Sequence, residues 1–125
     1  PARAPAVYHA MARYEGPAVV AELPLGYPDF DQRAVFYSTV HWRPVVNGYS
    51  GFTPPHYGRL TAVLSEIPRH ADVSLGILGE LGVTHVIVHE AAYIDGEGVA
   101  TSAVLRQSGA VELFRDGHAV LFQLR

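Results

Sequence analysis

The side chains best suited to chemistry in this chain are a glutamate, two histidines and a tryptophan at the ends of predicted strands. Glu22 ends a first apolar run, His41 and Trp42 follow a second, and His89 closes a third. Open α/β sheets bind ligands beyond the carboxyl ends of their parallel strands. We therefore expect these groups to converge in one pocket. A carboxylate beside a histidine there could do acid–base work or form an orienting hydrogen bond.

Residues 37–57 form the densest functional candidate and hold the single tryptophan. Aromatic faces, amide and guanidinium donors, and a backbone rich in proline and glycine suit a site that stacks on a sugar ring and binds its hydroxyls. The alternative is an ordered loop whose aromatics fill the core edge, with Gly48 and Gly51 allowing positive φ. The ligand-binding residues predicted on the first interpretation are Glu22, His41, Trp42, Arg43, Asn47, Tyr49 and His89.

Several short motifs also carry a family resemblance. They are ELP at 22–24, HWRP at 41–44, NGYSGF at 47–52, PPHY at 54–57 and LGVTHVIVH at 81–89. Together they resemble the soluble C-terminal part of bacterial polytopic membrane glycosyltransferases of the GT-C class, which includes protein mannosyltransferases and arabinosyltransferases. The resemblance spans roughly residues 19–89, well over half of the chain.

The resemblance implies a division of labour within a larger protein. Such enzymes take a sugar from a polyprenyl-phosphate donor, and their acidic catalytic residue lies in an extracytoplasmic loop between early membrane helices. No residue here matches that acid, so the domain alone is expected to be non-catalytic and to need no cofactor. The resemblance places it on the extracytoplasmic side of the cell membrane. Its partners would be the transmembrane portion of the same polypeptide and a glycan or polyprenyl-phosphate sugar.

Three sharper motifs favour simpler interpretations. Asp29-Phe30-Asp31 has the form of a metal-binding Asp-x-Asp, but its neighbours are turn formers, which indicates a solvated turn. Residues 48–52 lack the final glycine of a nucleophile elbow, because Phe52 stands there. His85 and His89 lie on the same face of a predicted strand, and with His41 they could in principle form a three-histidine zinc site. Four residues along a strand span about 13 Å, however, which is too far for two ligands of one zinc ion. We predict no metal site.

Composition excludes other classes of protein. The 125 residues carry a formal net charge of −3 with no basic run, which argues against nucleic acid as a partner. No apolar stretch reaches the 18 or more residues of a membrane span. The absence of cysteine removes disulfides and thiolate chemistry. Because the chain starts with Pro1 and has no targeting segment, we expect a single domain, residues 1–125, excised from a larger membrane protein.

The predicted elements alternate between helices and strands. Helices are expected over 5–16, 53–68, 72–82 and 101–108, and strands over 18–23, 34–40, 83–89, 111–114 and 119–124. Asp116-Gly117 predicts a two-residue turn between the last two strands. This order predicts an α/β fold with a mixed, mainly parallel sheet flanked by helices and a C-terminal antiparallel hairpin.

Other functions remain open beside the accessory domain of a glycosyltransferase. A free-standing carbohydrate or small-ligand binding module would use the same pocket without a membrane partner. A hydrolase or metal enzyme would be built on Glu22, His41 and His89. In a structural or interaction domain, Trp42 and Tyr49 would pack against another subunit or membrane loops.

Overall fold

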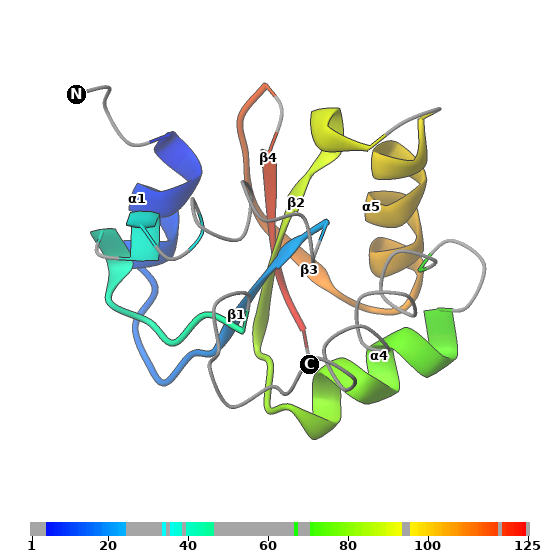
Figure 1. Ribbon diagram of the computed structural model, residues 1–125, viewed down its shortest axis with the longest axis horizontal. Coiled ribbons are helices and arrows are strands. Elements are labelled where there is room, and N and C mark those ends of the chain that lie inside the picture. The colour runs from blue at the N-terminus through cyan, green and yellow to red at the C-terminus, as the bar shows by residue number, and fades with distance from the viewer. Residues whose placement is uncertain are drawn as a thin grey trace.

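A four-stranded mixed sheet forms the centre of the fold, with helix α1 on one face and helices α4 and α5 on the other (Figure 1). This computed structural model describes residues 5–24, 34, 36–38, 40–46, 67, 71–93, 96–117 and 119–124. The strands are β1 (Val20–Leu23), β2 (His85–His89), β3 (Val111–Arg115) and β4 (Ala119–Gln123). The helices are α1 (Ala6–Ala12), α4 (Ala71–Glu80), α5 (Glu97–Gln107) and the 3₁₀ turn η1 (Glu90–Ala92).

The described strands have the order β1-β2-β4-β3, in which β1 and β2 pair parallel and the other two pairs are antiparallel. The fold is therefore α/β with a mixed sheet, as expected, whereas the predicted mainly parallel sheet fits only in part. Strand β4 takes the place beside β2, where it runs antiparallel to both of its neighbours. The carboxyl ends of β1 and β2 still lie together, since Leu23 is in register with Val88.

The predicted strand over 34–40 is also wrong, because the described residues 34, 36–38, 40 and 41 are helical. The segment is rich in β-branched and aromatic residues, but its buried side chains follow helical spacing. Ala34 is buried, Tyr37 and Val40 pack on the core beside α1, and Phe36 points outward. Tertiary packing has overridden the intrinsic preference of these residues for a strand.

The predicted C-terminal pair of strands is confirmed, with a longer connection than expected. Residues 116–118 separate β3 from β4, one more than the predicted two-residue turn. The Asp116 N–H donates to the Ala119 carbonyl at 3.0 Å, and the Asp116 carboxylate accepts from the Ala119 N–H at 2.9 Å. A register shift between Glu112 and Phe114 marks an irregularity in the outer strand β3.

The helices match the predicted positions where the structure describes them. Helix α1 follows Pro5 and buries Val7, Tyr8 and Met11. Helix α4 ends before Gly82, whose φ of 76° suits the residue after a helix. Helix α5 begins four residues earlier than predicted, at Glu97. The predicted helix over 53–68 lies outside the described residues, apart from the buried Ile67.

Two hydrophobic clusters cover the two faces of the sheet. Val86 and Val88 of β2 pack with α4 and α5, while Ile87 packs with α1. Alternation along the strand then places His85 and His89 on the same face as Ile87, toward α1. In the described parts of the chain, no helix combines the length and the apolar character needed to cross a bilayer.

Candidate functional site

The buried carboxylate of Glu22 is the centre of the candidate site. Glu22 lies in β1 and is 3% exposed. Its Oε1 accepts a hydrogen bond from the Tyr8 hydroxyl at 2.6 Å and lies 2.7 Å from the His89 Nε2. Two donors meeting one oxygen is the arrangement that an ionised carboxylate accepts. The parallel pairing of β1 and β2 brings Glu22 and His89 together, although 67 positions separate them in sequence.

Aromatic rings surround this carboxylate. The Tyr8 ring stacks on Tyr37 with centroids 4.7 Å apart, and it lies 6.3 Å from His41 and 6.4 Å from His89. We call Tyr8, Glu22, Tyr37, His41 and His89 the Glu22 cluster. Three of the predicted site residues, Glu22, His41 and His89, are thus brought together as expected.

The backbone after His41 holds that residue beside β1. The Val20 N–H donates to the Pro44 carbonyl and the Val46 N–H donates to the Val20 carbonyl, both at 2.8 Å. Val45 forms a parallel bridge with Val20. These bonds fix residues 44–46 along the outer edge of β1, and so bring the end of the preceding helical segment to the cluster.

His41 is 5% exposed and has a defined tautomer. Its Nδ1 accepts a hydrogen bond from the Arg43 backbone N–H at 2.9 Å. Burial lowers the pKa of His41, the charge of Glu22 opposes that shift, and the charge of Arg43 adds to it. The neutral ring therefore carries its proton on Nε2. Among the described residues, this Nε2 has no hydrogen-bond partner.

Trp42 is 79% exposed, so the predicted aromatic side chain is turned to solvent. Its φ of 56° is left-handed, a conformation that costs a non-glycine residue about 1–2 kcal/mol. Its N–H donates to the Ser38 carbonyl at 2.6 Å, which ends the helical segment. Phe36 is also exposed and packs edge-on against Tyr37. Exposed aromatic surface therefore adjoins the Glu22 cluster through Tyr37 and His41.

The predicted ligand-binding residue Arg43 is placed on the backbone instead. Its guanidinium donates to the carbonyls of Tyr14 and Gly16, in the connection between α1 and β1. Gly16 has a φ of 118°, which side-chain-bearing residues rarely adopt. Arg43 therefore acts as a clamp on this turn. Asn47 and Tyr49, the other predicted ligand-binding residues, lie outside the described residues.

Tyr8 and Tyr37 were not among the predicted site residues. Tyr8 was expected on the buried face of the first helix and Tyr37 at the start of the aromatic segment 37–57, and each contributes a ring to the Glu22 cluster. A signal for Tyr8 was available: a tyrosine on the buried face of a helix needs a partner for its hydroxyl. The buried carboxylate in the first strand is such a partner.

His85 has separate contacts at the other end of β2. It is fully buried, with Nδ1 2.7 Å from the Thr84 hydroxyl and its ring T-shaped against Tyr14 at 4.1 Å. Burial lowers the pKa of His85, and the charge of Arg43 lowers it further. Within the described ranges, no group of three His, Cys, Asp or Glu side chains could hold a metal ion.

A hollow of about 170 Å³ lies at the opposite end of the sheet from the Glu22 cluster. Its lining comes from α4, from the segment just before β2, and from residues just after the C-terminal ends of α5 and β4. Most of the lining residues are apolar. The lining residues are Leu75, Gly79, Val83, Ser108, Ala110 and Leu124. The sequence predicted a pocket at the carboxyl ends of the parallel strands, and this hollow is not that pocket.

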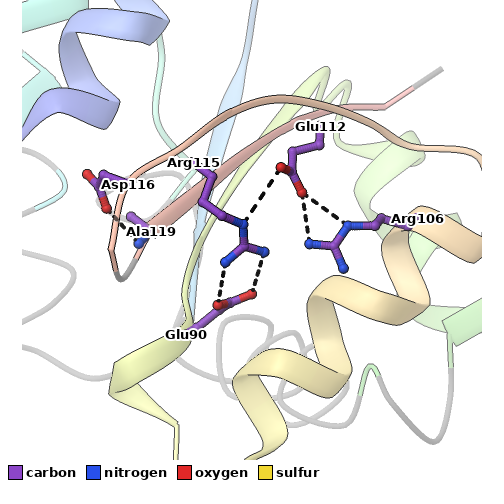
Figure 2. A network of polar contacts seen from close by, with 6 residues as sticks. All are labelled: Glu90, Arg106, Glu112, Arg115, Asp116 and Ala119. Carbon is purple, nitrogen blue, oxygen red and sulfur yellow. Dashed lines mark hydrogen bonds and ion pairs between the residues drawn. The ribbon is translucent and has the colours of Figure 1, made fainter.

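A second polar network lies on the surface between η1, α5 and β3 (Figure 2). Arg115 donates to both oxygens of Glu90, at 3.0 and 3.2 Å. Arg106 donates twice to one oxygen of Glu112, at 3.1 and 2.8 Å. Burial alone would raise the pKa of Glu90, but the hydrogen bonds from Arg115 and Ser102 and the charges of Arg115 and Arg106 together lower that pKa. These side chains pair with one another and tie the outer strand to the helices.

The Glu22 cluster therefore offers a carboxyl group, the N–H of His41 and aromatic surface in one place, which are groups that bind hydroxyls. No protein-family model, curated protein or solved structure matches this chain.

Proposed function

We propose that this chain is a soluble accessory domain of an integral membrane glycosyltransferase that uses a lipid-linked sugar donor. In this proposal it lies on the extracytoplasmic side of the membrane and assists recognition of the acceptor or the donor. The family assignment rests on the motifs at 22–24, 41–57 and 81–89. Sugar recognition rests on one observation: Glu22, His89 and His41 meet around Tyr8, next to the exposed Trp42.

The composition of this region supports a sugar more than an apolar ligand. Sugars present hydroxyls to polar groups and an apolar ring face to aromatic side chains. The cluster supplies the first kind of contact, and the 79% exposed Trp42 supplies the second. Trp42 has a left-handed backbone conformation and an exposed side chain, so its ring does not contribute to the core of the described residues. Its ring is therefore available to contact a ligand.

An NMR titration of the domain with manno- and arabino-oligosaccharides tests the proposal. We expect shifts at the Trp42 indole and at the His41 and His89 rings, and at least tenfold weaker binding in Trp42→Ala. Val73→Ala, which removes an exposed apolar side chain on α4, is the matched control and should bind normally. Absence of shifts, or equal binding by the two variants, would contradict sugar recognition by this region.

The membrane assignment has its own test in the parent protein. We expect the reading frame that encodes this chain to encode a series of hydrophobic spans. Sugar transfer measured in membranes should then fall with Trp42→Ala and stay unchanged with Val73→Ala. If the domain binds sugar but the frame encodes no spans, it is a free-standing carbohydrate-binding module.

The exposed Phe36 and Trp42 also favour a second candidate, an interaction domain whose aromatic surface packs against the membrane portion. On that hypothesis Trp42→Ala would loosen the assembled parent protein, with no sugar shifts in the isolated domain. Co-purification of the two portions after proteolytic separation would measure this.

A further inference from the structure

The Nε2 of His41 is a buried donor for which the described residues supply no acceptor. His41 is 5% exposed, its Nδ1 accepts the Arg43 N–H, and its Nε2 has no described partner. A buried donor left without an acceptor is desolvated with no compensating hydrogen bond, which costs free energy. An acceptor atom supplied by a ligand would remove that cost.

The charges around His41 decide which kind of acceptor fits. The carboxylate of Glu22 lies close enough to act on the titration of His41. Arg43, whose charge acts on His41, is already bonded to the carbonyls of Tyr14 and Gly16. Within the part of the chain that the structure describes, a phosphate would therefore meet a buried negative charge, and the cation that acts on His41 is already committed.

A hydroxyl has no such difficulty, because it is uncharged and both accepts and donates. His41 offers an N–H. The His89 Nε2 lies 2.7 Å from the Glu22 Oε1, and the His89 side chain is partly exposed. Both imidazoles flank the Tyr8 ring, at 6.3 and 6.4 Å. A hydroxyl can accept the His41 Nε2–H without adding a charge beside Glu22.

We propose that the Glu22 cluster recognises neutral sugar hydroxyls rather than a phosphate, with the His41 Nε2–H as the donor to one hydroxyl. This inference rests on the proposed function and makes it narrower. It assigns the cluster to the sugar ring of the acceptor or donor, and not to the phosphate of a lipid-linked donor.

Side-chain ¹⁵N NMR of the histidines at neutral pH tests the inference. Methyl α-mannopyranoside and methyl α-arabinofuranoside are the sugar probes, and inorganic phosphate is the anionic probe. We expect a sugar to shift the His41 Nε2–H resonance, and phosphate at equal concentration to leave it unchanged.

Two replacements of His41 separate its two nitrogens. His41→Asn keeps an acceptor near the position of Nδ1 and lacks the Nε2 donor, whereas His41→Gln places an amide N–H near the position of Nε2. We expect sugar binding to fall at least tenfold in the Asn variant and less in the Gln variant. Thermal unfolding of both variants checks that each one folds, and the wild-type titration tests the inference even if neither does.

The outcomes distinguish this inference from the function on which it rests. Sugar shifts at Trp42 with none at His41, or a phosphate-induced shift at His41, would overturn the inference and leave sugar recognition standing. No sugar shift anywhere would overturn both. If the sugar shifts the resonances of residues next to position 41 with the same affinity in the Asn variant as in the wild type, the donor role of Nε2 would be overturned.

Discussion

The Glu22 cluster and the surface network of Glu90, Arg106, Glu112 and Arg115 use similar groups in opposite surroundings. Glu22 is 3% exposed, and the Tyr8 hydroxyl and His89 Nε2 meet one of its oxygens. In the surface network the side chain of Glu112 is 33% exposed and that of Arg106 41%. Water can replace a lost partner of Glu112 or Arg106 much more readily than a lost partner of the buried Glu22 carboxylate.

The contrast concerns how strongly each residue depends on its partners. Removing a partner from a buried polar group leaves the group desolvated and unpaired, which costs about 1–3 kcal/mol. An exposed ion pair typically contributes about 0–1 kcal/mol, because solvent and salt screen it. The same type of substitution should therefore reduce the free energy of unfolding much more in the Glu22 cluster than in the surface network.

Glu22→Ala should have the largest effect. It removes the acceptor of the buried Tyr8 hydroxyl and of His89, and it leaves a gap beside the Tyr8 ring. We expect a loss of about 3 kcal/mol in the free energy of unfolding, measured by urea denaturation. Glu112→Ala, the same change in the surface network, should cost less than about 1 kcal/mol. Equal losses in the two variants would refute the contrast.

Gly98→Ala should have the next largest effect, because the backbone beneath the surface network is tightly packed. A Cβ at Gly98 would lie 2.2 Å from the Glu90 carbonyl oxygen and 2.6 Å from its Cα. Backbone atoms cannot move aside as a side-chain end can, so we expect a loss of about 2–3 kcal/mol.

Gly76→Ala in α4 is the matched control, since a Cβ there meets nothing within 4 Å. Alanine in a helix interior is favoured over glycine by roughly 0.5–1 kcal/mol, so this variant should be stabilised. The same substitution thus has opposite expected signs at the two sites. Thermal unfolding measures both, and a stabilised Gly98→Ala would show that α5 does not lie against Glu90 as described.

Much of the fold was accessible from the sequence because the local signals were clear. Val7, Tyr8 and Met11 keep helical spacing after a proline, and they form the buried face of α1. The apolar run that ends at His89 became the buried strand β2, in parallel pairing with β1. In both cases periodicity and packing agree, which is the condition for reading an element directly.

The order of the strands in the sheet and the helical conformation of residues 34–41 could not be predicted from the sequence, for a physical reason. Propensity favoured a strand there, but the contacts of Tyr37 and Val40 with the α1 side of the core require a helix. The predicted parallel strand was therefore absent from the described sheet, and β4 lies beside β2 instead. Long-range pairing of this kind leaves no mark in local sequence.

The candidate site was predicted in part. Glu22 and His89 were expected together because polar residues at the ends of parallel strands share an edge of the sheet, whereas His41 reaches them from the end of a helical segment. Tyr8 was missed because its ring is a core residue and only its hydroxyl bonds to Glu22. Arg43 was placed in the site by its neighbours in sequence, whereas its guanidinium reaches backbone carbonyls on the α1 side.

Acid should destabilise the fold through its buried histidines. Burial is the main cause of the lowered pKa of both His41 and His85, so the fold favours their neutral forms. In the unfolded chain histidine has a pKa of about 6.5. Below that pH the unfolded state binds more protons, so stability is complete above about pH 6.5 and falls as the pH drops toward the folded values.

Urea denaturation across pH 5 to 8 measures this dependence. His85→Asn, which keeps a polar group near the Thr84 hydroxyl, should flatten the decline between pH 6.5 and 5. Arg43 lowers the pKa at both histidines, and Glu22 opposes the shift at His41 alone. His9→Gln, at an exposed position on α1, is the control and should keep the wild-type decline. A variant of His85 with an unchanged decline would remove that residue from the explanation.

The smallest expected effect separates the two regions by their response to salt. Glu112→Gln weakens pairing with Arg106 and Arg115, for which we expect a loss of about 0.5 kcal/mol at low ionic strength. At 1 M NaCl the screening length shrinks to about 3 Å, so this loss should nearly vanish. Tyr8→Phe removes a buried hydrogen bond to Glu22 and should cost about 1.5 kcal/mol at both salt concentrations. If salt reduced the two losses by the same fraction, the carboxylate of Glu22 would be as exposed to solvent as that of Glu112. The Glu22 cluster would then bind a ligand at a hydrated surface and not in a desolvated site.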